Sequence, residues 1–431
     1  MPQLDAQGVT NANQPKPHTA SLMQFVLSLL AMLFAWGVAF LLVLLGLIQR
    51  FIPSDTAVDA LPILLTSAGA FLIGFLLLPS VIYAWKGMSR DASHSAVTMD
   101  GYLLPLAAIL LLPLAIWLGS WLGDSEPFAW LLLPPLHILA IGLPILLLVY
   151  VGIRKIPVGS PQRFWGLLAS GSFLAPVLIF SVEIISILIL VIMGAIWLSN
   201  QPEMLSKLRD LAQSMQQMET NPAEIQSMLT PYLTRPGVIL AAFAFAALFV
   251  PLVEELLKPI GVWFLVGSAL NPARGFVAGV LCGAGYALFE SLGLANSGDL
   301  WSGLVIARMG TAAVHIFTTA LTGWALAIAW KENRYLLLGA IYLLNVLVHG
   351  MWNAFTLTIV FTELPRVGSN FQRIARIGEY APYVLIGLTI LTFTGLLVMN
   401  LRLSHQQARE IAPETGGIIP PVVKETNGPD I

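Results

Sequence analysis

The sequence has little charge and almost no cysteine. Only 10% of its 431 residues are charged and 57% are hydrophobic, whereas a water-soluble domain carries about 25% charged residues. So little charge cannot cover the surface of a soluble fold, which excludes that class. The net charge of −2 gives no indication of a nucleic-acid partner. The single cysteine, Cys282, excludes an intrachain disulfide.

Long apolar runs are what the chain has instead. They predict an all-α, polytopic transmembrane helical bundle of about ten spans. The first run is longer than the apolar core of a cleavable signal, so we expect it to stay as a signal anchor. The predicted spans cover residues 21–48, 60–86, 101–122, 128–152, 164–199, 237–267, 273–295, 301–330, 335–362 and 380–402.

These runs divide the chain into six parts. The two polar ends are predicted to be disordered cytoplasmic tails. The parts are a tail (1–20), an N-terminal five-span membrane region (21–199), an extracytoplasmic amphipathic segment (200–236), a second membrane region (237–362), an outer loop with the last span (363–402), and a second tail (403–431).

Loop charges predict the orientation. With ten spans both termini share one side, and that side holds 12 of the 21 basic residues. The other side holds 7, and Lys258 and Arg308 lie within spans. By the positive-inside rule both termini are cytoplasmic, and we expect a multi-pass protein of the plasma membrane.

The segment 200–236 shows helical periodicity. Its apolar residues step by three and four positions, as on one face of a helix: Met204, Leu208, Leu211, Met215 and Met218. Two interpretations remain open, a helix lying on the outer leaflet or the bundle and a lid that gates substrate.

The most informative feature is a group of charges in an apolar run. Glu254, Glu255 and Lys258 lie in LFVPLVEELLKPIGVWFL. Each charge at the centre of a bilayer costs at least about 2.5–3.5 kcal/mol. A self-neutralised pair would leave the second glutamate uncompensated, so the group indicates a functional site.

Further polar residues follow in the next three spans: Glu290, Arg308, His315, His349 and Asn353. We expect four consecutive helices to converge on one cavity. A carboxylate there can act as a general base, and Asn353 can stabilise an oxyanion. Two histidines, a carboxylate and a water form a common hydrolytic zinc site, although the sequence has no HExxH.

Other polar residues have simpler interpretations. His137 and Glu183 more often serve as structural hydrogen-bonding groups. The glycines of GVLCGAG, at 279, 283 and 285, favour close helix packing rather than a phosphate loop. The buried charges also permit a proton- or cation-coupled transporter. Such transporters often have two similar halves, whereas these polar groups gather in one half.

At these residues the sequence resembles the PrsW intramembrane proteases, relatives of the CAAX-protease and bacteriocin-processing group. EELLK at 254–258 matches their EExxK motif and Phe289–Glu290 the start of FExxxY. His315 resembles the third, His-led motif, and His349 in HGMWN the final HxxxD motif. The resemblance covers about residues 237–362.

The resemblance implies an intramembrane endopeptidase, called a metalloprotease in that family, that cleaves membrane-anchored proteins such as anti-sigma factors. The resemblance implies that Glu254 and Glu255 activate water and that His315 is essential. Lys258 and Asn353 are the further catalytic candidates, from the chemistry of their side chains. The metal ligands for a divalent ion such as zinc would be His315, His349 and Glu290. A glutamate-only mechanism is the alternative. Two departures, Leu294 for the motif tyrosine and Asn353 for its final acid, also permit a non-catalytic membrane scaffold.

Overall fold

The computed structural model describes residues 17–52, 60–88, 97–99, 101–123, 126–217, 222–268, 270–293, 300–362 and 369–411. Every regular element in these ranges is helical, which confirms the all-α class. The N-terminal helices are α1 (Pro17–Phe51), α2 (Ala60–Met88), α3 (Leu103–Gly123), α4 (Glu126–Ile153), α5 (Pro161–Ala169), the π-helix η1 (Ser170–Leu174) and α6 (Ala175–Ser199). The remaining helices are α7 (Pro202–Gln217), α8 (Pro222–Leu233), α9 (Pro236–Ala244), the π-helix η2 (Phe245–Phe249), α10 (Val250–Leu257), α11 (Ile260–Trp263), α12 (Pro272–Gly293), α13 (Leu300–Glu332), α14 (Tyr335–Thr362) and α15 (Ser369–Ile411).

Ten helical stretches in the described part of the chain are long and apolar enough to cross a membrane. This confirms the predicted number of spans, and the predicted ends differ from the observed ones by a few residues. The last span differs most, because α15 continues to Ile411. Residues 403–411 are therefore helical and not part of a disordered tail. Leu403 and Gln407, four residues apart, are buried, so packing extends the helix.

The first tail also ends earlier than predicted, since α1 begins at Pro17. The rest of both predicted tails, residues 1–16 and 412–431, lies outside the described residues.

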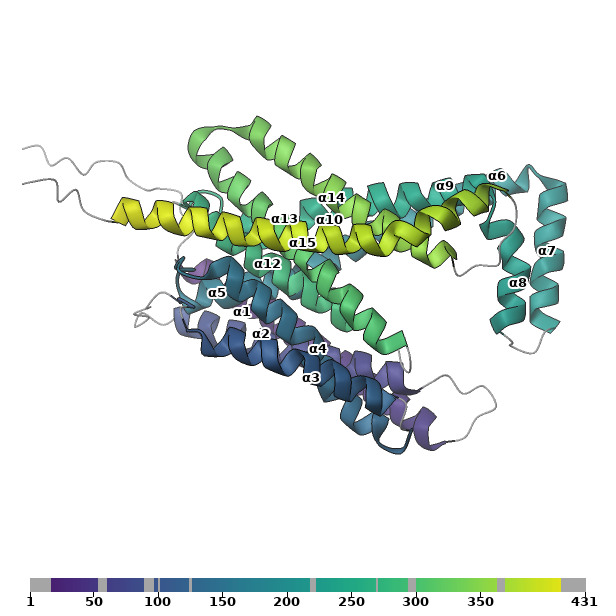
Figure 1. The fold of residues 1–431 in the computed structure, drawn as a ribbon, viewed down its shortest axis with the longest axis horizontal. Coiled ribbons are helices and arrows are strands. Elements are labelled where there is room, and N and C mark those ends of the chain that lie inside the picture. The colour runs from purple at the N-terminus through teal and green to yellow at the C-terminus, as the bar shows by residue number, and fades with distance from the viewer. Residues whose placement is uncertain are drawn as a thin grey trace, which may run out of the picture.

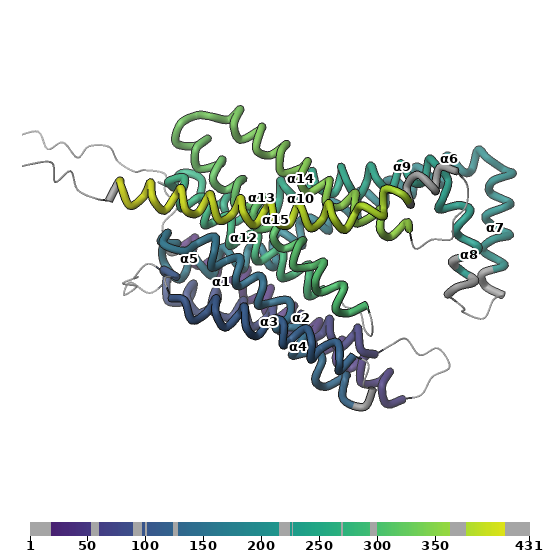
Figure 2. The backbone as a smooth tube through the Cα atoms, in the orientation of Figure 1, coloured from purple at the N-terminus to yellow at the C-terminus, as the bar shows by residue number. Residues whose placement is uncertain are grey.

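Helix α12 is the centre of the bundle. In an apolar stretch of 18 residues within α12, 89% of the residues are buried, and the same fraction is buried in α13. In Figure 1 the N-terminal helices α1–α5 occupy the lower part of the molecule and α14 and α15 the upper part, while α12 lies between them and α13 runs from the upper part down to the lower one. The backbone trace shows the same arrangement (Figure 2). The two membrane regions that the sequence separates therefore meet along α12.

Glycines allow α12 and α13 to approach closely. A Cβ at Gly283 would lie 2.8 Å from the His315 carbonyl oxygen and 2.9 Å from the Ile316 Cα. A Cβ at Gly279 would meet the Thr319 backbone, and one at Gly285 the Leu168 backbone. The packing role predicted for these glycines is confirmed, and it sets the backbone of His315 against α12.

The helix that carries Glu254 and Glu255 is irregular at both ends. A π-turn, η2, precedes α10, and Pro259 separates α10 from the short α11. Proline lacks a backbone N–H and breaks the helical hydrogen-bond ladder. The charged turn is therefore a short helix held between two irregular points.

Segment 200–236 forms two helices, α7 and α8, rather than one. Met204, Leu208 and Leu211 are half-buried along one face of α7, whereas Lys207 and Arg209 are exposed. Met218 lies outside the described residues. In Figure 1, α7 and α8 stand beyond the ends of α6 and α9, at one end of the molecule.

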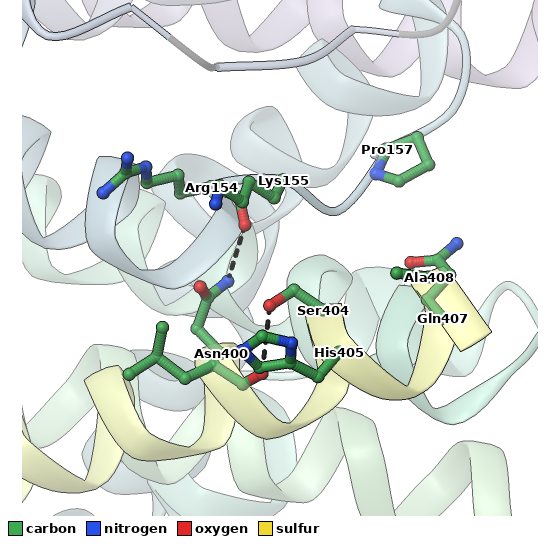
Figure 3. A pocket seen from close by; sticks show the side chains of 9 residues that line it. Arg154, Lys155, Pro157, Asn400, Ser404, His405, Gln407 and Ala408 are labelled. Atoms are coloured by element: carbon green, nitrogen blue, oxygen red, sulfur yellow. Dashed lines mark hydrogen bonds between the residues drawn. The ribbon is translucent and has the colours of Figure 1, made fainter.

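A cavity of about 550 Å³ lies where α4 ends beside α15 (Figure 3). Its lining includes Arg154, Lys155 and His405, and Asn400 Nδ2 donates to the carbonyl oxygens of Gly152 and Arg154. None of the converging glutamates and histidines lines this cavity. The contact joins α15 to the N-terminal region.

We predict that Gly283→Ala destabilises the protein by about 1–3 kcal/mol, the usual cost of overpacking, because its Cβ would push against the α13 backbone. Unfolding of the detergent-solubilised protein measures the effect. Gly303→Ala is the matched control, since a Cβ at Gly303 on α13 meets nothing within 4 Å. Equal stability of the two variants would contradict the packing argument.

Candidate functional site

Glu255 is the most heavily engaged acid of the site. It is fully buried, and its Oε1 lies 2.5 Å from Lys258 Nζ and 2.9 Å from His349 Nδ1. The hydroxyl of Thr318 also donates to this oxygen, at 3.2 Å. Lys258 directly follows α10, His349 lies on α14 and Thr318 on α13, so this carboxylate of α10 joins three helices.

Glu254 is the less engaged glutamate. Its Oε2 lies 3.8 Å from both Lys258 Nζ and His349 Nε2, beyond hydrogen-bond distance. This oxygen is buried without a hydrogen-bond partner, although the Tyr286 hydroxyl interacts with the carboxylate. Lys258 lies within ion-pair distance of both glutamates, and its shorter contact is to Glu255. Glu254 keeps an oxygen available for a ligand.

His315 uses both ring nitrogens. Nδ1 lies 2.9 Å from Lys258 Nζ, and Nε2 lies 2.6 Å from Glu290 Oε2. An ammonium group only donates, so Nδ1 accepts and the Nε2–H donates to Glu290. Arg308 Nη2 also lies 2.9 Å from Glu290 Oε2. Glu290 is thus part of the site, as expected from the sequence.

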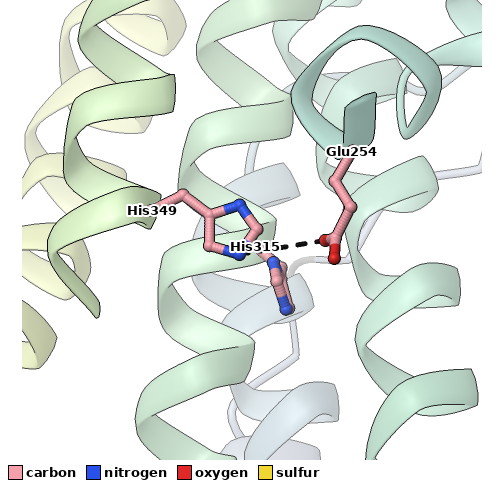
Figure 4. A group of neighbouring side chains, drawn as sticks. All are labelled: Glu254, His315 and His349. Carbon is pink, nitrogen blue, oxygen red and sulfur yellow. Dashed lines mark ion pairs between the residues drawn. The ribbon is translucent and has the colours of Figure 1, made fainter. Parts of the chain in front are cut away.

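His349 faces His315 at a right angle. The ring centroids are 5.0 Å apart and the planes meet at 88°. His349 Nδ1–H donates to Glu255, which leaves the lone pair on Nε2. Figure 4 shows His315, His349 and Glu254 pointing toward one another from α13, α14 and α10.

Glu254, His315 and His349 form a possible metal site. Each offers one ligand atom, and these atoms lie within 4.8 Å of one another. The predicted ligand set had Glu290 in the place of Glu254. Instead, Glu290 and Glu255 each accept from a histidine N–H, as carboxylates behind metal-bound histidines do.

The oxygen and nitrogen donors of these three side chains fit a divalent ion, provided that the contact between Lys258 and His315 is broken. The buried, unbonded Oε2 of Glu254 and the Nε2 of His349 are open to a cation. The third donor, His315 Nδ1, already accepts from Lys258. The ammonium therefore occupies one side of the place where a metal would bind, and a metal would have to displace it.

Asn353 does not face these groups. Its Nδ2 donates to the Ala246 carbonyl oxygen in η2, at 2.8 Å. A π-turn shifts the helical hydrogen bonds by one residue, and the Asn353 amide binds a carbonyl of that turn. Gly350 on the same helix faces the Ala247 backbone. Asn353 therefore ties α14 to the segment that leads into Glu254.

Tyr286 is a site residue that the sequence analysis missed. It is buried, its ring stands edge-on to His315 with centroids 5.1 Å apart, and Lys258 Nζ lies 5.5 Å from its ring centroid. Its position four residues before Glu290, on the same helical face, was the available signal. Leu294, where the motif has its tyrosine, lies outside the described residues.

His137 lies elsewhere, as its structural interpretation predicts. It is fully buried, and the indole N–H of Trp301 donates to its Nδ1 at 3.2 Å.

Comparison with protein families identifies the same part of the chain. The model of the PrsW family intramembrane metalloproteases matches residues 222–371. The resemblance found in the motifs is thereby confirmed for this segment, which contains every side chain of the cluster described above. Searches of the curated proteins and of the solved structures gave no match.

We predict that Lys258→Met strengthens zinc binding by at least about tenfold, because it frees His315 Nδ1 and removes a cation from a low-dielectric site. Calorimetric titration of the purified protein with Zn²⁺ measures the change without any substrate. Arg308→Met is the control, since it removes a buried cation that pairs with Glu290 and not with His315 Nδ1. If wild-type protein binds Zn²⁺ as tightly as Lys258→Met, the ammonium does not compete.

Proposed function

With the family match over residues 222–371 as the premise, we propose that this protein is an intramembrane endopeptidase that hydrolyses peptide bonds of membrane-anchored proteins. One observation carries the proposal: Glu254 keeps a buried oxygen without a hydrogen bond beside two histidines from neighbouring helices. A carboxylate near a substrate water is the arrangement that general-base hydrolysis requires.

Glu254 is the proposed base. It takes a proton from a water molecule while the water oxygen bonds to the substrate carbonyl carbon. The tetrahedral intermediate then breaks its C–N bond, and Glu254 returns the proton to the leaving amine nitrogen. The Lys258 ammonium, held by Glu255 and His315, is the nearest fixed positive charge and stabilises the oxyanion.

Glu255, Glu290 and Thr318 have positioning roles in this proposal. Glu255 and Glu290 hold the tautomers and ring positions of His349 and His315, and Thr318 holds Glu255. Asn353, expected to act on the oxyanion, acts instead through the backbone of η2. An acid at position 353 would not donate to that carbonyl, so this departure from the family motif has a structural use.

The donor set also supports a metal-assisted form of the reaction. His315 Nδ1, His349 Nε2 and Glu254 would hold a divalent ion such as zinc. The matched family is described as one of metalloproteases. Such an ion supplies Lewis-acid polarisation of the carbonyl and a more acidic water.

The proposed setting is the plasma membrane, with both termini in the cytoplasm. The ten apolar helices support a multi-pass protein, and the distribution of basic residues supports the orientation. The proposed substrate class is a membrane-anchored protein, of which an anti-sigma factor is one example.

We predict that Glu254→Gln lowers the cleavage of membrane proteins at least about 10²-fold, the lower limit for loss of a general base. Comparing membrane-protein fragments in cells that express wild-type or variant protein measures the loss. Glu203→Gln, the same change at an exposed acid of α7, is the control and keeps wild-type cleavage. Fragment patterns that do not differ between wild type and Glu254→Gln would contradict the protease assignment and favour a scaffold or a transporter.

A further inference from the structure

Helix α6 leaves the bundle part-way along its length. Its first turns pack tightly, since Ala175 and Ile179 are fully buried against Tyr286, with Val253 and Leu257 beside them. Beyond this contact α6 is free, and every residue from 187 to 197 is exposed. In Figure 1, α6 extends with α9 toward the end of the molecule that carries α7 and α8.

Glu183 lies at the point where α6 separates from the bundle. It follows Ile179 by four residues, so it projects from the face that packs on Tyr286. Its side chain is half-buried, and its Oε1 is buried without a hydrogen-bond partner. The contacts of Ile179 with Tyr286 and of Phe180 with Phe289, the neighbour of Glu290, place this part of α6 beside the cluster of glutamates and histidines.

No cation of the described residues pairs with Glu183. The two basic residues of the site are already engaged. Lys258 contacts Glu255 and His315, and Arg308 contacts Glu290 and the Ser291 hydroxyl. An ionised acid without a cationic partner is costly at membrane depth, so a cation that reaches Glu183 makes a favourable contact.

The cluster is most accessible on the side next to α6. The Glu290 side chain is 26% exposed, whereas that of Glu254 is 9% and that of Glu255 is 0%. The rings of Phe180 on α6 and Phe289 on α12 are 5.7 Å apart, so this open side adjoins α6. A segment that approaches along the exposed part of α6 passes Glu183 before it reaches Glu290.

We propose that Glu183 forms a substrate subsite that binds the side chain of a lysine or arginine in the segment to be cleaved. Charge complementarity selects this occupant, because the open side presents an acid with no basic partner among the described residues, whereas its neighbour Glu290 is already paired with Arg308. Long basic side chains can extend along an apolar helix to reach such a group. Glu183 lies outside the matched residues 222–371, so the N-terminal membrane region contributes to substrate choice.

The subsite rests on the proposed function for the nature of its occupant, so its test measures binding apart from cleavage. The probes are synthetic apolar peptides of about 20 residues, long enough to span a bilayer. Each carries one photo-reactive group and a single Lys, Gln or Glu at a position that is scanned along the peptide. Binding is measured to full-length protein with Glu254→Gln in lipid nanodiscs, with and without Glu183→Gln.

With Glu183 present, peptides with Lys at one or a few adjacent positions bind at least about tenfold more tightly than the Gln peptides, as for a charge-assisted contact. Glu183→Gln removes the difference, and Glu183→Arg transfers the preference to the Glu peptides. Glu203→Gln leaves the Lys preference intact. Thermal unfolding of each variant shows that the fold is kept.

Two results would overturn the subsite. One is a Lys preference that survives Glu183→Gln, and the other is the absence of any Lys preference with Glu183 in place. Neither depends on catalysis. A failure of the protease assignment shows itself separately, as equal cleavage by wild type and Glu254→Gln.

Discussion

The buried carboxylate of Glu255 is the interaction on which the rest of the site depends. One oxygen receives contacts from Lys258, His349 and Thr318, which belong to three helices. In lipid, burial of apolar surface does not favour one arrangement of helices over another. Polar contacts and close packing therefore determine how the helices are arranged. Removing one member of such a buried pair leaves an uncompensated charge, so the helices are held in one relative position.

Irregular helix geometry supports this arrangement from two sides. The π-turn η2 precedes the glutamates and receives the Asn353 amide, while Pro259 ends the charged turn. The second π-turn, η1, includes Gly171, which faces the backbone of Cys282 on α12. π-Turns are frequent at functional sites, and here η1 lies against α12 and η2 lies against α14.

The two neighbouring glutamates differ because of their surroundings. Glu255 is surrounded by donors, whereas Glu254 keeps an unbonded oxygen. The position of Lys258 also affects metal binding, because its ammonium contacts His315 Nδ1, the nitrogen that a metal would use. The Lys258 ammonium and a metal ion would therefore compete for the same place beside His315. In the proposed subsite, Glu183 adds a further acid at the open side of the site.

Hydropathy and charge by themselves determined the class, the ten spans and the membership of Glu254, Glu255, Lys258, Glu290, His315 and His349 in one site. This was possible because length and apolarity decide whether a helix spans a bilayer, and because charges at that depth need partners. Glycine spacing on α12 likewise indicated close packing, which Gly283 confirms.

Only the tertiary structure decided which atoms meet. The positions of Glu290 and His315 along separate spans do not determine which atoms meet, and helix packing brings Glu290 Oε2 to 2.6 Å from His315 Nε2. Asn353 turned toward η2, and Tyr286 joined the cluster, because rotation about a helix axis is set by neighbouring helices and not by local sequence. The end of α15 was also decided by burial of Leu403 and Gln407. The sequence determined that a polar site had to exist in the membrane, and packing between helices decided which glutamate is held and which is free.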